Sequence, residues 1–135
     1  MSNEKISLLL IEDEDAQRMI YQKVFAKEPF QVIGEASNGQ EGVQLFTQLK
    51  PDIILCDIHM PIMDGLATLK NILALDDKAC IIMLTIVDHP DIWQECIALG
   101  ARYFMKKNTP YSKMQQIVLD SWQEHQRMVL GKSAD

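Results

Sequence analysis

Apolar residues fall in five short runs along the chain, and each run is followed by a polar turn and a segment with helical spacing. The runs are Ile6–Ile11, Phe30–Gly34, Ile53–Cys56, Cys80–Thr85 and Arg102–Met105. The helical segments lie at about residues 14–27, 39–49, 65–75, 90–99 and 110–129. Strands and helices that alternate at these lengths predict an α/β domain with a parallel sheet, right-handed crossovers and helices on both faces.

The composition of each run predicts its place in the sheet. The first, third and fourth runs are almost uninterrupted apolar sequence, as expected for strands that are buried on both faces. The second and fifth runs mix polar and apolar residues, as edge strands can. This pattern favours the strand order 2-1-3-4-5, the flavodoxin-like doubly wound arrangement.

Acidic residues follow two of the strands that this order makes neighbours. Glu12 and Asp13 come after the first strand, and Asp57 comes after the third. In an open α/β sheet, ligands bind beyond the carboxyl ends of the strands where the strand order reverses, which is here between the first and third strands. Thr85 ends the fourth strand and Lys106 follows the fifth. We therefore expect all five side chains to face one rim.

The charges at this rim indicate what it would bind. Three carboxylates and one lysine leave a net charge of about −2, and crowded carboxylates resist ionising together. Mg²⁺ prefers oxygen ligands and commonly bridges to a phosphate. A lysine and a threonine hydroxyl would hold the anion beside the metal, so a carboxylate nucleophile could form an aspartyl phosphate. Taken singly, an acidic turn, a strand-end threonine and a surface lysine are ordinary structural features, and only their joint placement favours a site.

Length and composition agree with one domain and exclude several classes of function. The chain has 135 residues, 47% of them hydrophobic, and a net charge of −6. Without a basic patch with interleaved aromatic residues, direct binding of nucleic acid is not expected. The first apolar run is too short for a signal peptide or a membrane span. Three cysteines without metal-binding spacing predict a reduced, cytoplasmic protein.

Four segments together resemble the receiver domain of two-component response regulators, in particular the chemotaxis-regulator type. They are Leu8–Asp13, Pro51–Gly65 with its D-x-x-M-P-x-M-D-G pattern, Met83–Thr85 and Gly100–Lys106. The similarity covers residues 6–126, which we interpret as the receiver domain. Residues 1–5 would be a tail, and residues 127–135 the end of the last helix and a tail or the start of a linker.

The resemblance implies a signalling phosphoprotein rather than an enzyme with an external substrate. Asp57 would take a phosphoryl group from a sensor histidine kinase or a phosphotransfer protein, as in a phosphorelay, and the domain would catalyse only its own phosphorylation and dephosphorylation. Asp13, Asp57 and the backbone carbonyl of His59 would ligate Mg²⁺, with Glu12 binding directly or through water. Lys106 would pair with the phosphoryl group.

The resemblance also implies a switch. Thr85 would move toward the phosphoryl group, and Tyr103 would move inward with it. The motion would alter the face made by the fourth helix, the fifth strand and the fifth helix, which would bind a downstream effector or a second phosphorylated copy of the chain. No membrane partner is implied.

The sequence departs from the common receiver pattern at several positions. Glu12 stands where a first Asp is usual, and Ile86 stands where a small residue is usual, so it should narrow access to Asp57. Lys107 replaces a proline and is expected to turn toward solvent. Helical spacing through Val129 predicts that the chain beyond Trp122 projects from the domain. The main alternative is a pseudo-receiver, a protein-interaction module that is never phosphorylated; an enzyme that hydrolyses phosphate esters would need a cap domain.

Overall fold

The computed structural model describes residues 5–86, 90–129 and 131, and this part of the chain contains five strands and five helices. The strands are β1 (Ile6–Ile11), β2 (Phe30–Ala36), β3 (Ile53–Asp57), β4 (Cys80–Thr85) and β5 (Tyr103–Lys106). The helices are α1 (Asp15–Val24), α2 (Gly39–Leu49), α3 (Gly65–Leu75), α4 (Pro90–Leu99) and α5 (Tyr111–Met128). The predicted alternation of strands and helices is confirmed. The fifth strand, however, begins one residue later than predicted.

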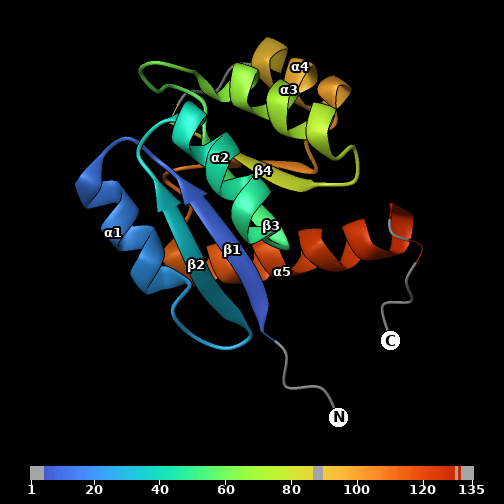
Figure 1. The fold of residues 1–135 in the computed structure, drawn as a ribbon. Helices are drawn as coiled ribbons and strands as arrows, with labels where there is room; N and C mark the ends of the chain where they lie inside the picture. The colour runs from blue at the N-terminus through green and yellow to red at the C-terminus, as the bar shows by residue number, and fades with distance from the viewer. Residues whose placement is uncertain (1–4, 87–89, 130, 132–135) are drawn as a thin grey trace.

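The strands form one parallel sheet in the order β2-β1-β3-β4-β5, so the predicted flavodoxin-like order is confirmed. Helices α1 and α5 cover one face of the sheet, and α2, α3 and α4 cover the other (Figure 1). The reversal of strand order lies between β1 and β3. Both strands therefore open onto the same rim at their carboxyl ends.

The core consists of two layers, one on each face of the sheet. Alternate residues of β1 enter different layers: Leu9 and Ile11 pack toward α2, α3 and α4, whereas Leu8 and Leu10 pack toward α1 and α5. Every residue of β3 and β4 is buried. Burying one Leu or Ile side chain stabilises a fold by about 1.5–3 kcal/mol. The central strands are thus fixed firmly, and so are the residues at their ends.

The start of α3 lies directly against the end of β3. The Asp64 side chain caps α3 by accepting a hydrogen bond from the backbone N–H of Ala67 (2.9 Å), and the N–H of Gly65 donates to the carbonyl of Ile58 (2.7 Å). A Cβ atom at Gly65 would lie 2.3 Å from the carbonyl oxygen of Asp57. Only glycine therefore allows this close approach of the helix to the strand end.

Helix α5 remains attached to the body almost to its end. Its residue His125 is buried and its Nε2 lies 2.8 Å from the carbonyl oxygen of Lys78, in the loop before β4. Glu124 forms an ion pair of 3.6 Å with Arg102. The prediction that the chain projects from the domain beyond Trp122 is therefore wrong, because the next helical turn still contacts the loops before β4 and β5.

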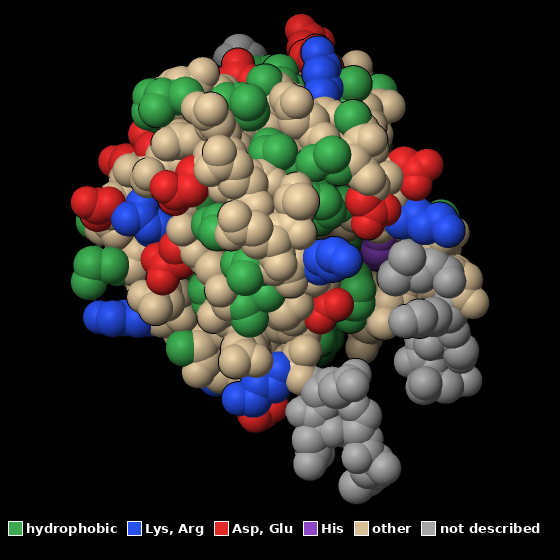
Figure 2. Space-filling view, viewed as in Figure 1, with side chains coloured by type: hydrophobic (Ala, Val, Ile, Leu, Met, Phe, Trp, Pro, Cys, Tyr) green, Lys and Arg blue, Asp and Glu red, His purple; other side chains and the backbone are tan. Residues whose placement is uncertain are grey.

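The face of the molecule shown in Figure 2 is mixed in charge. On the face shown in Figure 2, the Lys and Arg side chains of the described residues are scattered among acidic and hydrophobic ones. In the part of the chain that the structure describes, no helix is long and apolar enough to cross a bilayer.

Candidate functional site

Three carboxylates meet at the rim between β1 and β3. Glu12 and Asp13 follow β1 and Asp57 is the last residue of β3, and one oxygen from each lies within 4.8 Å of the others. Glu12 and Asp57 are buried, whereas Asp13 is half-buried. The predicted convergence of these three acids is confirmed. The group is open to solvent on the side of Asp13.

The lysine that contacts these acids is Lys107. Its Nζ lies 2.8 Å from Glu12 Oε1 and 3.1 Å from Asp57 Oδ1, and its side chain is only 9% exposed. The Nζ of Lys106 instead lies 5.6 Å from the centroid of the Trp93 ring on α4. The expectation that Lys106 faces the acids while Lys107 turns toward solvent is wrong.

The start of β5 explains this exchange. Successive side chains of a strand point to opposite faces, so a shift of one residue reverses them all. With β5 beginning at Tyr103, Lys106 pairs with Thr85 and shares the face of the sheet that α4 covers. Lys107 is the first residue beyond the strand, and its backbone N–H donates to the carbonyl of Thr85 (2.7 Å). This bond keeps Lys107 beside the end of β4, within reach of Asp57.

The same shift separates the predicted switch pair. Tyr103 is 44% exposed and borders a hollow against α5, whereas Thr85 is buried and lies on the other face of the sheet. The aromatic residue on the face of Thr85 is Phe104, which is buried and whose ring centroid lies 5.0 Å from that of Trp93. Tyr103 therefore cannot follow Thr85 into the core, because the sheet stands between them.

The loop between β3 and α3 borders the acids on the outside. The side chain of His59 is exposed, and a hydrogen bond from its backbone reaches the carboxylate of Asp57. Ile62 is 77% exposed with φ of 69°, and Met63 N–H donates to the carbonyl of Pro61 (2.7 Å). This tight three-residue turn holds a β-branched residue in the left-handed region, a strained conformation. This turn could not be predicted from the sequence, because Ile62 is apolar and carries no turn signal.

Ile86 follows Thr85 at the opposite side of the rim. Its side chain is 78% exposed. A side chain this exposed is not packed into the body of the domain. That Ile86 narrows the access of an incoming group to Asp57 stays a prediction.

Burial and charge set the protonation of the site. Burial raises the pKa of the Glu12 carboxyl to about 7; a hydrogen bond with Lys107 opposes the rise and the charge of Asp57 adds to it. Burial also raises the pKa of Asp57, although Lys107 counteracts it. Burial alone would lower the pKa of Lys107, but the bond with Glu12 and the charge of Asp57 raise it above its ordinary value. Lys107 is therefore a firmly protonated cation between two acids.

The donor set fits Mg²⁺. It consists of carboxylate oxygens, and a third acid beyond the two that Lys107 contacts leaves an excess of negative charge. Mg²⁺ takes oxygen ligands, keeps several waters and needs only one or two protein carboxylates, which a partly open group provides. Asp13 and Asp57 are suited to bind it, and Glu12 could do so only by sharing its oxygens with Lys107 and the N–H of Glu14.

Comparison with known proteins places the fold and site in a broader context. Residues 8–119 match the family model described as the response regulator receiver domain. The chain is 36% identical over 100 residues to the chemotaxis protein CheY of Thermotoga maritima, covering 74% of this chain and 83% of that protein. It is also 36% identical over 101 residues to sporulation initiation phosphotransferase F of Bacillus subtilis, covering 75% and 79% of the two chains.

A solved structure of a chemotaxis complex contains a chain with a similar fold. The CheY chain in the CheX–CheY–BeF₃–Mg²⁺ complex of Borrelia burgdorferi superposes with a TM-score of 0.83 at 28% identity, covering 87% of this chain and 89% of that one.

Proposed function

The chain belongs to the response-regulator receiver family, and we propose that it is a phosphoacceptor that carries a phosphoryl group on Asp57. The observation that supports this most directly is the close group of Glu12, Asp13 and Asp57, to which Lys107 adds a buried positive charge. A nucleophilic carboxylate, a place for a divalent metal and a fixed cation are the parts that phosphoryl transfer needs.

The proposed reaction is transfer from a phosphohistidine of a sensor kinase or phosphotransfer protein. A carboxylate oxygen of Asp57 attacks the phosphorus, the P–O bond forms and the P–N bond of the donor breaks. The electron pair of that bond returns to the imidazole ring, which then takes up a proton. Hydrolysis of the resulting acyl phosphate by water ends the signal.

Lys107 takes the role in this proposal that the sequence alone had given to Lys106. To hold a phosphoryl oxygen, its ammonium group would exchange the contact with Asp57 Oδ1 for one with the transferred group. The contact with Glu12 Oε1 can persist and keep the ammonium in place. Bound Mg²⁺ would supply positive charge to the transferred oxygens; Asp13, Asp57 and the backbone of His59 are the groups proposed to hold it.

The proposed switch pairs Thr85 with Phe104. Both lie on the face covered by α4, and Phe104 contacts Trp93 of that helix. A shift of Thr85 toward the phosphoryl group would leave space that Phe104 could enter, and Trp93 would respond. The outer side of α4 carries a shallow apolar hollow of about 440 Å³ lined by Trp93, Gln94, Ile97 and Ala98. An effector, or a second copy of the chain, would read the change at this face of α4, β5 and α5.

The protein would act in the cytoplasm, where its kinase partner presents the phosphohistidine, and the functional domain would span residues 6–126. Neither carrying the phosphoryl group nor binding a partner would require the turnover of an external substrate.

The test is phosphorylation by a small donor. Incubating the protein with Mg²⁺ and acetyl phosphate and then measuring its intact mass should show one added phosphoryl group. The label should be absent when Mg²⁺ is chelated and absent in Asp57→Asn, whereas Asp52→Asn, at the opposite end of β3, should be labelled normally. A label that persists in Asp57→Asn would refute the assignment. An unlabelled wild-type protein would favour the pseudo-receiver.

A further inference from the structure

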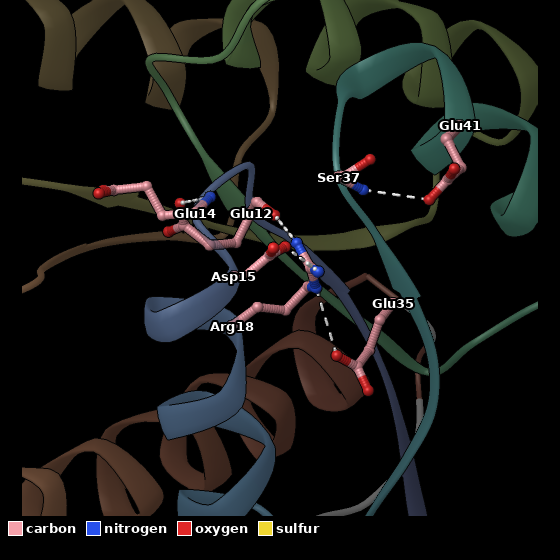
Figure 3. Close-up of polar contacts among 7 residues, drawn as sticks. All are labelled: Glu12, Glu14, Asp15, Arg18, Glu35, Ser37 and Glu41. Atoms are coloured by element: carbon pink, nitrogen blue, oxygen red, sulfur yellow. Dashed lines mark hydrogen bonds and ion pairs between the residues drawn. The ribbon is translucent and has the colours of Figure 1, made fainter.

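Every polar group of Glu12 has a partner in the structure. Its backbone N–H donates to the carbonyl of Ala36 (3.0 Å), and its Oε2 accepts from the N–H of Glu14 (3.2 Å). Its Oε1 contacts Lys107. Its backbone carbonyl accepts a hydrogen bond of 2.7 Å from Nη1 of Arg18, one turn into α1 (Figure 3). The turn that carries Glu12 and Asp13 is thus held by β2, by Lys107 and by Arg18 of α1.

Arg18 binds more than this carbonyl. Its Nη2 contacts Asp15 Oδ1 at 2.6 Å, and its Nε lies 3.4 Å from Glu35 Oε1 on β2 (Figure 3). The guanidinium side chain is only 18% exposed. One planar group therefore ties the turn after β1 to the first turn of α1 and to the neighbouring strand. A lysine could not make these contacts together, because its single ammonium lacks the fork of donors.

An irregularity in β2 places Glu35 where Arg18 can reach it. Leu8 pairs with Val32, but Leu9 pairs with Gly34, so β2 contains one extra residue at this point. Beyond it, Glu35 pairs with Leu10, whose side chain faces α1 and α5. Without the extra residue Glu35 would pair with Ile11 and face α2. Bulges commonly re-aim a side chain near a functional site in this way.

We propose that Arg18 is a positioning residue for the metal site, which rests on the function proposed above. The carbonyl of Glu12 and the N–H of Asp13 belong to one rigid peptide plane. By fixing this plane, Arg18 sets the direction in which Asp13 leaves the strand and the depth at which Glu12 meets Lys107. Its role is exerted through Glu12 and Asp13, and it touches neither the metal nor the phosphoryl group.

The experiment measures Mg²⁺ binding to the unphosphorylated full chain by isothermal titration calorimetry. Loss of a group that orients metal ligands commonly weakens binding ten- to a hundredfold, and for Arg18→Met we expect a dissociation constant about tenfold higher. Arg18→Lys can still donate to the carbonyl, so it should lose less. Glu35→Gln should also lose less, because the carbonyl contact is kept.

Arg102→Met is the matched control. Arg102 has a similar exposure of 20% and one ion pair of 3.6 Å, but it lies away from the acids. It should bind Mg²⁺ as the wild type does, even if it melts at a lower temperature. Circular dichroism at the titration temperature identifies any variant that is not folded; if Arg18→Met is not, Arg18→Leu, which also removes the bond to the carbonyl of Glu12, takes its place.

The outcomes separate the two proposals. A wild-type protein that takes the phosphoryl group on Asp57 together with folded Arg18 variants that bind Mg²⁺ unchanged would overturn the role of Arg18 alone. A wild-type protein that neither binds Mg²⁺ nor becomes phosphorylated would overturn the proposed function and this inference with it.

Discussion

Strand β3 ends in Asp57 and strand β5 is followed by Lys107, and these two residues meet at the candidate site. β3 lies in the middle of the sheet, whereas β5 lies at its edge. All five residues of β3 are buried, and the strand has neighbours on both sides. β5 is an edge strand of four residues, of which two are buried. Asp57 is the last residue of its strand, whereas Lys107 lies one position beyond its own.

The difference shows how strongly each end is determined. In β3 the first four residues are buried and apolar, so the end of this apolar run marks the position of Asp57. In β5 polar side chains are tolerated at both ends, and two registers one residue apart suit the same four-residue pattern. A shift of one residue then exchanges the faces of all side chains. Substitutions on the two faces of β5 distinguish these two registers.

The largest effect is expected at the two adjacent lysines. Replacing Lys107 by Met removes the cation that is proposed to hold the transferred oxygens, and losses of such groups cost about a hundred- to a thousandfold in rate. Lys106→Met should change the rate by much less, because Lys106 lies over Trp93. The measurement is the rate of phosphorylation by acetyl phosphate with Mg²⁺, followed by intact mass. A greater loss of rate in Lys106→Met than in Lys107→Met would favour the register of β5 that was predicted from the sequence.

The next effect concerns stability at the two adjacent aromatic residues. Phe104 is buried against Trp93, so Phe104→Ala should lower the free energy of unfolding by about 3 kcal/mol. Tyr103 is 44% exposed, and Tyr103→Ala should cost less than about 1 kcal/mol. Urea denaturation of both variants gives the comparison. Equal losses would mean that both faces of β5 are packed alike.

These two pairs also show how far the sequence could lead. The fold, the order of strands and the acids at the ends of β1 and β3 follow from apolar runs and from the rule that binding sites lie at a reversal of strand order. Lys107 and Phe104 were confused with their neighbours, because the edge strand carries no unbroken apolar run. A signal was available in the four residues Tyr-Phe-Met-Lys, whose apolar middle pair marks the buried positions of β5.

The role proposed for Arg18 could not be predicted from the sequence for a different reason. This role depends on an extra residue in β2. Gly34 beside that residue is a weak sign of a bulge, but it does not show which side chain the bulge brings toward Arg18. The strained Ile62 is similar, since an isoleucine predicts extended structure and the turn is imposed by the loop that must join β3 to α3.

A smaller effect is expected at this loop beside Asp57. Ile62 has φ of 69°, a region in which a β-branched residue is strained and Asn is tolerated. Its side chain is 77% exposed, so little packing is lost on substitution. Ile62→Asn should therefore raise the free energy of unfolding by about 1 kcal/mol. Urea denaturation measures it, with Ile86→Asn, at an equally exposed isoleucine, as the control that should gain nothing. No gain at Ile62 would mean that the turn relaxes freely.

The smallest effect concerns pH and the helix that covers the face of β5 opposite α4. Burial lowers the pKa of His125 below its ordinary value of 6.5; its bond to Lys78 opposes this, Arg102 adds to it and Asp76 opposes it. Below about pH 6.5 the unfolded chain therefore binds a proton that the folded protein does not yet take. Unfolding is favoured by this proton, so the stability due to neutral His125 is complete above pH 6.5 and is lost as the pH falls toward the lowered pKa.

Other groups titrate over the same range, and the raised pKa of Glu12 has the opposite sign: its contribution is lost as the pH rises from its ordinary value of 4.5 to about 7. The test is therefore a difference between two proteins. His125→Gln keeps a donor for the carbonyl of Lys78 but cannot be protonated. The free energy of unfolding of the wild type minus that of His125→Gln should decrease between pH 7.5 and pH 5.5, while the contribution of Glu12 cancels. A difference that stays constant over this range would show that His125 becomes charged as easily in the folded protein as in the unfolded chain.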